Sequence, residues 1–118
     1  MRPKVGHWSE IPEETVSSAK GLYRRWLITP RDGAPNFAMR LFRMVPGGET
    51  PPHSHDWEHE VFILSGRGRA ILDGEEYELN PGTFLFIPGG TEHAFRNDGR
   101  EDLVFLCLIP ASAVPPGK

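Results

Sequence analysis

Residues 51–60 read PPHSHDWEHE, and this segment puts three histidines and three carboxylates within ten positions. His53 and His55 are two residues apart, so on an extended strand their imidazoles point to the same face. His59 follows after a short polar connection and opens the apolar run Val61–Leu64. A His-x-His pair and a third histidine on a neighbouring strand converge on one point, which is the arrangement that a divalent transition metal needs.

A fourth histidine, His93, lies far along the chain in a turn framed by glycine and proline. A single histidine on a strand is usually structural or exposed, but four convergent imidazoles have no ordinary packing explanation. We therefore interpret His53, His55, His59 and His93 as the ligands of one metal ion.

Short apolar runs, separated by Gly, Pro, Asn and Asp, fill the rest of the chain. They predict strands at 21–28, 37–45, 59–64, 69–72, 75–79, 83–87, 93–95 and 103–109. The segment Pro46–Gly48 is expected to break the second strand, and Ile11–Val16 to begin a helical turn. The last strand is apolar on both faces, so it is expected to be central or covered. About eight short strands at this spacing predict an all-β sandwich or barrel.

Length and composition indicate one domain over residues 1–118, with a core at about 21–110, an N-terminal arm at 1–20 and a tail at 111–118. The net charge of −3 argues against a nucleic-acid or membrane-surface partner. The single cysteine, Cys107, excludes an intrachain disulfide and fits a reducing compartment. Without a signal-peptide pattern or a membrane-length apolar run, the expected location is cytoplasmic.

Two motifs with fixed spacing resemble those of the cupin superfamily. The first runs Gly, five residues, His-x-His, three or four residues, Glu, six residues and Gly, and the chain follows it from Gly47 to Gly66 with a histidine in place of the glutamate. The second runs Gly, five residues, Pro-x-Gly, two residues, His, three residues and Asn. It is matched at every position by Gly82, Pro88, Gly90, His93 and Asn97. The resemblance implies a double-stranded β-helix, or jelly roll, with a metal inside one end.

The position that carries glutamate in most cupins is His59 here, and its neighbour Glu60 is the alternative ligand. The six residues between His59 and Gly66 favour His59, whereas strand parity does not choose, because Val61–Leu64 are all apolar. From about Ala34 the chain is similar to the small tetra-histidine manganese cupins, and that resemblance implies that His59 is a ligand and Mn²⁺ the metal. Imidazole ligands also accept Fe²⁺, Ni²⁺, Cu²⁺ and Zn²⁺.

Further residues are candidates for the substrate pocket or for support of the metal ligands. Phe105 and Cys107 share strand parity and are expected to face the cavity. Arg40 interrupts an apolar strand, so it is either exposed at an edge or an inward group that meets an anionic substrate. The remaining candidates are Thr50, Glu60 and Phe95.

The residues favour an enzyme for a small-molecule substrate. Four neutral imidazoles leave the full charge on the metal and, in octahedral geometry, two adjacent positions open. No general base is evident, which favours a dioxygenase-like oxidoreductase that uses dioxygen or peroxide to oxidise or cleave an organic molecule. The alternatives are a non-redox isomerase or lyase for a sugar-like or dicarbonyl substrate, and a small-molecule binding module. A homodimer is expected through the apolar surface of Trp8, Tyr23 and Trp26.

Overall fold

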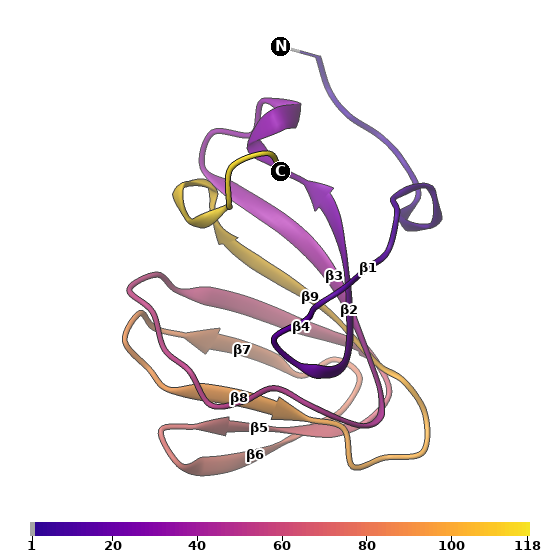
Figure 1. The fold of residues 1–118 in the computed structure, drawn as a ribbon, viewed down its shortest axis with the longest axis vertical. Helices are drawn as coiled ribbons and strands as arrows, with labels where there is room; N and C mark the ends of the chain where they lie inside the picture. The colour runs from indigo at the N-terminus through magenta and orange to yellow at the C-terminus, as the bar shows by residue number, and fades with distance from the viewer. Residues whose placement is uncertain (1) are drawn as a thin grey trace.

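The computed structural model describes residues 2–118, which form an almost entirely β-structure (Figure 1). The strands are β1 (Glu14–Thr15), β2 (Lys20–Ile28), β3 (Phe37–Glu49), β4 (His59–Ser65), β5 (Gly68–Leu72), β6 (Glu75–Leu79), β7 (Phe84–Ile87), β8 (His93–Arg96) and β9 (Leu103–Pro110). The helical turns are η1 (Trp8–Glu10), η2 (Pro30–Asp32) and η3 (Ala111–Ala113). Across residues 2–118, no helix has the length and apolar character that a membrane crossing requires.

All strand pairs are antiparallel, and the strand order is β6-β5-β8-β3-β9-β4-β7, with β2 also on β3 and β1 on β2. The long strand β3 connects the two halves of the sheet. Its residues 37–44 pair with β9, and Glu49 at its end pairs with Arg96 of β8. The sheet therefore curls around its inner face (Figure 1). The fold is the double-stranded β-helix, or jelly roll, as predicted from the sequence.

Two local predictions were wrong. β3 continues through Pro46–Gly48 to Glu49, because hydrogen bonds from neighbouring segments hold this part. The backbone N–H of Gly47 donates to the Asn97 carbonyl (2.9 Å), and the Asn97 N–H donates to the Gly48 carbonyl (3.0 Å). The segment 11–16 forms no helical turn; it contains β1, which pairs with β2 in the register Glu14 to Arg24.

The inner face follows from strand alternation. On β9, Leu103, Phe105, Cys107 and Ile109 are buried, and the residues between them are only partly covered. β9 lies between β3 and β4, so the strand predicted to be central or covered is central. β4 alternates in the same way, beginning with a buried His59. The candidate site residues His59, Phe105 and Cys107 thus share one interior with the hydrophobic core.

Two residues of the predicted motifs hold turns together. Gly66 has a φ of 83°, and a Cβ at this position would collide with the backbone carbonyl of Asp102. Asn97 is fully buried and donates from Nδ2 to the carbonyls of Met44 and Glu101, both at 2.8 Å. Because these contacts fix the backbone, the role of both residues is structural.

Candidate metal centre

The two motifs meet in a short β-bridge between His53 and His93. The His53 N–H donates to the His93 carbonyl (3.1 Å), and the His93 N–H donates to the His53 carbonyl (2.9 Å). Next to this bridge, the Gly90 N–H donates to the His55 carbonyl at 2.8 Å. Gly89 packs so closely against the backbone of Asp56 that a Cβ would clash with its carbonyl oxygen. Backbone contacts therefore fix the loop that carries the His-x-His pair.

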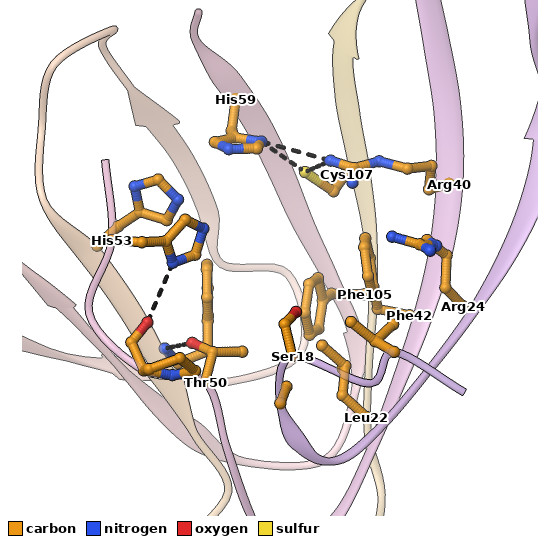
Figure 2. A pocket seen from close by; sticks show the side chains of 15 residues that line it. Ser18, Leu22, Arg24, Arg40, Phe42, Thr50, His53, His59, Phe105 and Cys107 are labelled. Carbon is orange, nitrogen blue, oxygen red and sulfur yellow. Dashed lines mark hydrogen bonds between the residues drawn. The ribbon is translucent and has the colours of Figure 1, made fainter. Parts of the chain in front are cut away.

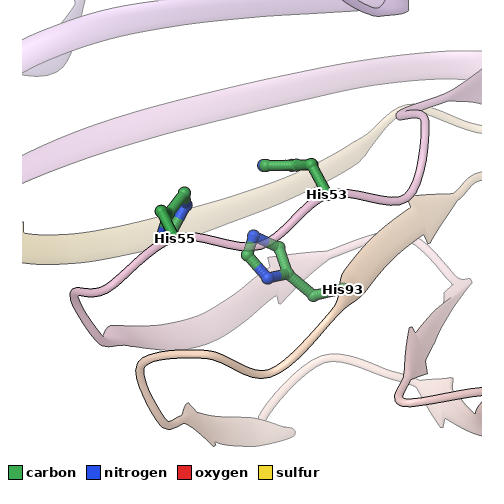
Figure 3. Close-up of side chains that lie close together, drawn as sticks. All are labelled: His53, His55 and His93. Carbon is green, nitrogen blue, oxygen red and sulfur yellow. The ribbon is translucent and has the colours of Figure 1, made fainter.

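His53, His55 and His93 form a cluster in which the three ligand atoms all lie within 4.8 Å of one another (Figure 3). Each Nδ1 faces a backbone carbonyl two residues away. The acceptors are Pro51 O at 3.0 Å, Trp57 O at 3.3 Å and Thr91 O at 2.9 Å. A carbonyl can only accept, so each Nδ1 carries the proton and each Nε2 keeps its lone pair. In this tautomer, Nε2 of each of the three side chains is available to bind a metal.

His59 joins this cluster from β4. Its Nε2 lies 3.0 Å from Nε2 of His55, and its ring centroid is 4.9 Å from that of His93. Its Nδ1 contacts no carbonyl; it lies 3.2 Å from Sγ of Cys107 and 3.4 Å from Nη2 of Arg40. The sulfur contact is short for a bond to sulfur, so we place the Nδ1 proton there, which leaves Nε2 free.

The spacing of the imidazoles fits a shared ion. Metal–nitrogen bonds of about 2.1 Å that meet at a right angle place two nitrogens about 3.0 Å apart. The two Nε2 atoms of His55 and His59 have this separation, although two lone pairs would repel each other without a cation between them. Neutral imidazoles suit transition metals, whereas Ca²⁺ and Mg²⁺ prefer oxygen ligands. The residues therefore fit a divalent transition metal.

Burial favours the neutral form of three imidazoles, those of His55, His59 and His93. Loss of hydration lowers the pKa of His59 to about 3, and the positive charge of Arg40 contributes to the same shift. Burial also lowers the pKa of His55 and of His93 below the ordinary value of 6.5. At neutral pH the three side chains are uncharged, which is the state that binds a metal.

Trp57 supports His55, a half-buried candidate ligand. Its indole stacks on the imidazole with the ring centroids 3.9 Å apart and the planes 5° from parallel. The Trp57 carbonyl also accepts from Nδ1 of the same histidine, at 3.3 Å. One residue thus fixes both the plane and the tautomer of His55. The sequence shows an aromatic residue near the pair but not this contact.

A cavity of about 390 Å³ opens beside the histidines (Figure 2). His53, His59 and His93 contribute to one end of its wall, and most of the remaining wall is apolar. Three phenylalanines form a stack within it: the Phe105 ring lies 5.2 Å from Phe42 and 5.2 Å from Phe95, in each case tilted by 17°. The cavity therefore offers an apolar, aromatic space next to the candidate metal centre.

The cupin domain family matches residues 40–109 of this chain. The protein is a cupin. It is 36% identical to polyketide synthase CurC of Streptomyces cyaneus over 98% of this chain and 75% of that protein. The solved structure of the polyketide cyclase RemF from Streptomyces resistomycificus is similar with a TM-score of 0.88 and 36% identity, over 93% of this chain and 80% of that one.

Another relative is the 1-methylthio-D-xylulose 5-phosphate methylsulfurylase of Rhodospirillum rubrum, which is 36% identical over 66% of this chain. This cupin spans only half the length of that protein. The activities that these three proteins are named for differ from one another. Family membership alone therefore leaves the reaction open.

Of the six pocket candidates named from the sequence, the structure places all but Glu60 in the cavity wall. The cavity wall includes Arg40, Thr50, Phe95, Phe105 and Cys107. Arg40, for which the sequence left two orientations, points inward and is buried. Glu60 is the exception, because its exposed side chain lies on the opposite face of β4 from His59, outside this cavity. The structure therefore does not place Glu60 among the residues of this cavity.

Several wall residues were not predicted. The expected N-terminal arm contributes Val16, Ser18 and Ala19, and β2 contributes Leu22 and Arg24. No pattern in the sequence indicates that the arm folds back over the cavity. Phe42 could have been found, because it has the same strand parity as Arg40.

Proposed function

We propose that this cupin is a metal-dependent enzyme for a small and largely apolar organic molecule. The observation that carries the proposal is the convergence of four imidazoles, each with a free Nε2, at the end of an aromatic cavity. His53, His55, His59 and His93 would hold the metal. A bound divalent metal would supply Lewis acidity, and manganese or iron would add a one-electron redox couple.

The chain's own residues would bind and orient the substrate. The phenylalanine stack would hold an apolar body and keep water away from the reacting end. The Thr50 hydroxyl already accepts from the Phe95 N–H at 2.8 Å, so it shapes the wall. Within residues 2–118, the cavity wall includes no Asp or Glu that could act as a general base. This favours a dioxygenase-like oxidoreductase as the first candidate.

The second candidate is a non-redox reaction of a substrate with several carbonyl groups, such as a ring closure. It is favoured by the likeness to RemF, described as a polyketide cyclase, and to CurC, described as a polyketide synthase. In this case the metal would act only as a Lewis acid. The apolar cavity suits either candidate.

Metal replacement separates the two candidates. Protein freed of metal with a chelator is reloaded with Mn²⁺, Fe²⁺ or Zn²⁺ and offered alkenes, diketones and polycarbonyl compounds, with and without dioxygen or peroxide. We expect oxidant-dependent turnover with manganese or iron and none with zinc. Oxidant-independent turnover with zinc would replace the first candidate with the second. Absence of turnover with every metal would leave a binding module and overturn the enzyme proposal.

A further inference from the structure

Arg40 is a buried cation on the inner face of β3, opposite Cys107 in the strand register. Its Nη2 donates to Sγ of Cys107 at 3.0 Å, and its Nε is buried without a hydrogen-bond partner among residues 2–118. A thiol sulfur is a weak acceptor. A guanidinium has five N–H donors, so most of the donor capacity of Arg40 is unused.

His59 does not accept a hydrogen bond from the unused donors of Arg40. Its Nδ1 lies 3.4 Å from Nη2 of Arg40, but a metal-binding His59 carries its proton on Nδ1. An N–H group cannot accept from a guanidinium. This step rests on the proposed function, because it takes His59 as a metal ligand.

The charge of Arg40 is also unpaired. Nearby arginines have carboxylate partners: Arg24 reaches Glu14 at 2.8 Å, and Arg43 reaches Glu13 at 2.8 Å. Arg40 has no such partner within residues 2–118. Burying a cation without a counter-charge costs stability, so a position that keeps one is a candidate for binding an anion.

Two aromatic rings hold the guanidinium in place. The Arg40 Cζ lies 4.8 Å from the centroid of Phe42 and 5.6 Å from that of Trp26. A guanidinium held in this way is already ordered, so less conformational entropy is lost when a ligand binds to it. The same Phe42 belongs to the phenylalanine stack, so the cation and the apolar wall adjoin (Figure 2).

We propose that Arg40 is the carboxylate subsite of the cavity, and that the ligand is a monocarboxylate with a planar, apolar body. The planar fork of a guanidinium matches a carboxylate, and the phenylalanine stack matches a ring system. The carboxylate lies beside Arg40 and Cys107, and the body extends along Phe42, Phe95 and Phe105. This deepens the proposed function by naming a substrate class.

The test compares 2-naphthoate with its neutral analogue 2-naphthamide by calorimetry on the full chain, as purified and after chelator treatment. We expect naphthoate to bind at least about tenfold more tightly in both preparations, because a charge-assisted bond is lost in the amide. Arg40→Met should remove this preference. Arg69→Met is the matched control: it changes an arginine outside the cavity wall whose charge Asp98 already balances, and it should keep the preference.

A preference that persists in Arg40→Met would overturn the subsite. So would a preference that disappears with the metal, because the carboxylate would then bind the metal and not Arg40. If Arg40→Met does not fold, the Nε–H resonance of Arg40 in the wild-type protein takes its place, and it should shift with naphthoate but not with naphthamide. If the metal-loaded protein turns over a substrate but does not prefer naphthoate to naphthamide, only the Arg40 subsite is rejected. If it prefers naphthoate but turns over no substrate, only the enzyme proposal is rejected.

Discussion

At the scale of single residues, the choice between His59 and Glu60 determines the charge of the candidate metal centre. The two neighbours point to opposite faces of β4, with His59 buried and Glu60 exposed. A glutamate ligand would offset part of the charge of a divalent ion, whereas a neutral imidazole leaves it intact. The inward position of His59 therefore favours a strongly electrophilic metal.

Replacement of His59 tests this assignment. We expect His59→Ala to lower the affinity for Mn²⁺ or Zn²⁺ by more than about tenfold. Mutation of a residue that only hydrogen-bonds to a metal ligand already lowers metal affinity by about tenfold or more, and loss of a ligand itself should lower it further. Competition with a chromophoric chelator measures the affinity. Glu60→Ala is the matched control on the adjacent residue and should bind as the wild type does. Equal affinities in the two variants would contradict the role of His59.

At the scale of elements, β1 and the segment after it close the cavity. Val16 and Ala19 pack against the core and line the cavity wall. The segment is attached through Glu14, whose carboxylate accepts from Nε1 of Trp26 (2.8 Å) and Nζ of Lys118 (3.1 Å) as well as from Arg24 (2.9 Å). One carboxylate thus links β1, β2 and the end of the chain.

This link predicts a pH dependence of stability. Burial alone would raise the pKa of Glu14, but the hydrogen bonds from Lys118, Trp26 and Arg24 outweigh it and lower the pKa from 4.5 to about 2. A depressed carboxyl pKa contributes stability that is fully present above pH 4.5 and is lost as the pH falls towards 2. Because the side chain is about one-third exposed, we expect a contribution of only about 1 kcal/mol.

Urea unfolding of chelator-treated protein between pH 5 and about pH 2.5 measures this contribution. Glu14→Gln should lose less unfolding free energy over this range than the wild type, because it has no carboxyl to titrate. Glu49→Gln, at an exposed position of β3, is the control and should follow the wild type. If the unfolding free energies of the wild type and of Glu14→Gln fall by the same amount between these pH values, the prediction is refuted.

At the scale of the whole molecule, the outer face of β4 and β7 carries several exposed apolar side chains beside the exposed Glu60. Phe84 is 80% exposed, Phe86 59%, Phe62 44% and Leu64 43%. In the strand register Phe62 pairs with both Phe84 and Leu106, so the side chains form a continuous row. β7 is also the last strand in the sheet order. An exposed apolar face that reaches a sheet edge favours contact with a second copy.

The surface expected from the sequence is less suitable. Trp26 and Tyr23 are only partly exposed, and arginine side chains lie over both rings, Arg24 at 5.0 Å and Arg43 at 4.5 Å. Trp8 is half exposed, but Arg25 lies 5.0 Å from its ring. We therefore keep the prediction of a homodimer and place its interface on β4 and β7.

Sedimentation analysis tests the dimer. We expect the wild type to sediment as a dimer and the double variant Phe84→Ser, Phe86→Ser to sediment as a monomer, because the apolar contact area is lost. Trp8→Ser is the control for the surface favoured by the sequence and should remain dimeric. A monomeric wild type, or dissociation by Trp8→Ser alone, would disprove this interface.

The sequence alone determined most strand positions, the all-β class and the four candidate ligands, and the resemblance of its motifs to those of cupins implied the jelly roll. These features depend on local rules, since alternation, turn residues and motif spacing are read along one stretch of chain. It also placed Phe105 and Cys107 on one face of their strand. It could not determine which face of β4 or β3 turns inward, because apolar residues occupy both faces of each strand.

Only the tertiary structure decided that His59 faces the cluster, that Arg40 is buried without a counter-charge and that residues 16–19 line the cavity. Each depends on partners distant in sequence. Arg40 lies opposite Cys107 across a strand pair, and the N-terminal segment is held by Glu14 against Arg24, Trp26 and Lys118. The curl of the sheet brings these groups together, and the spacing of residues along the chain does not specify that curl.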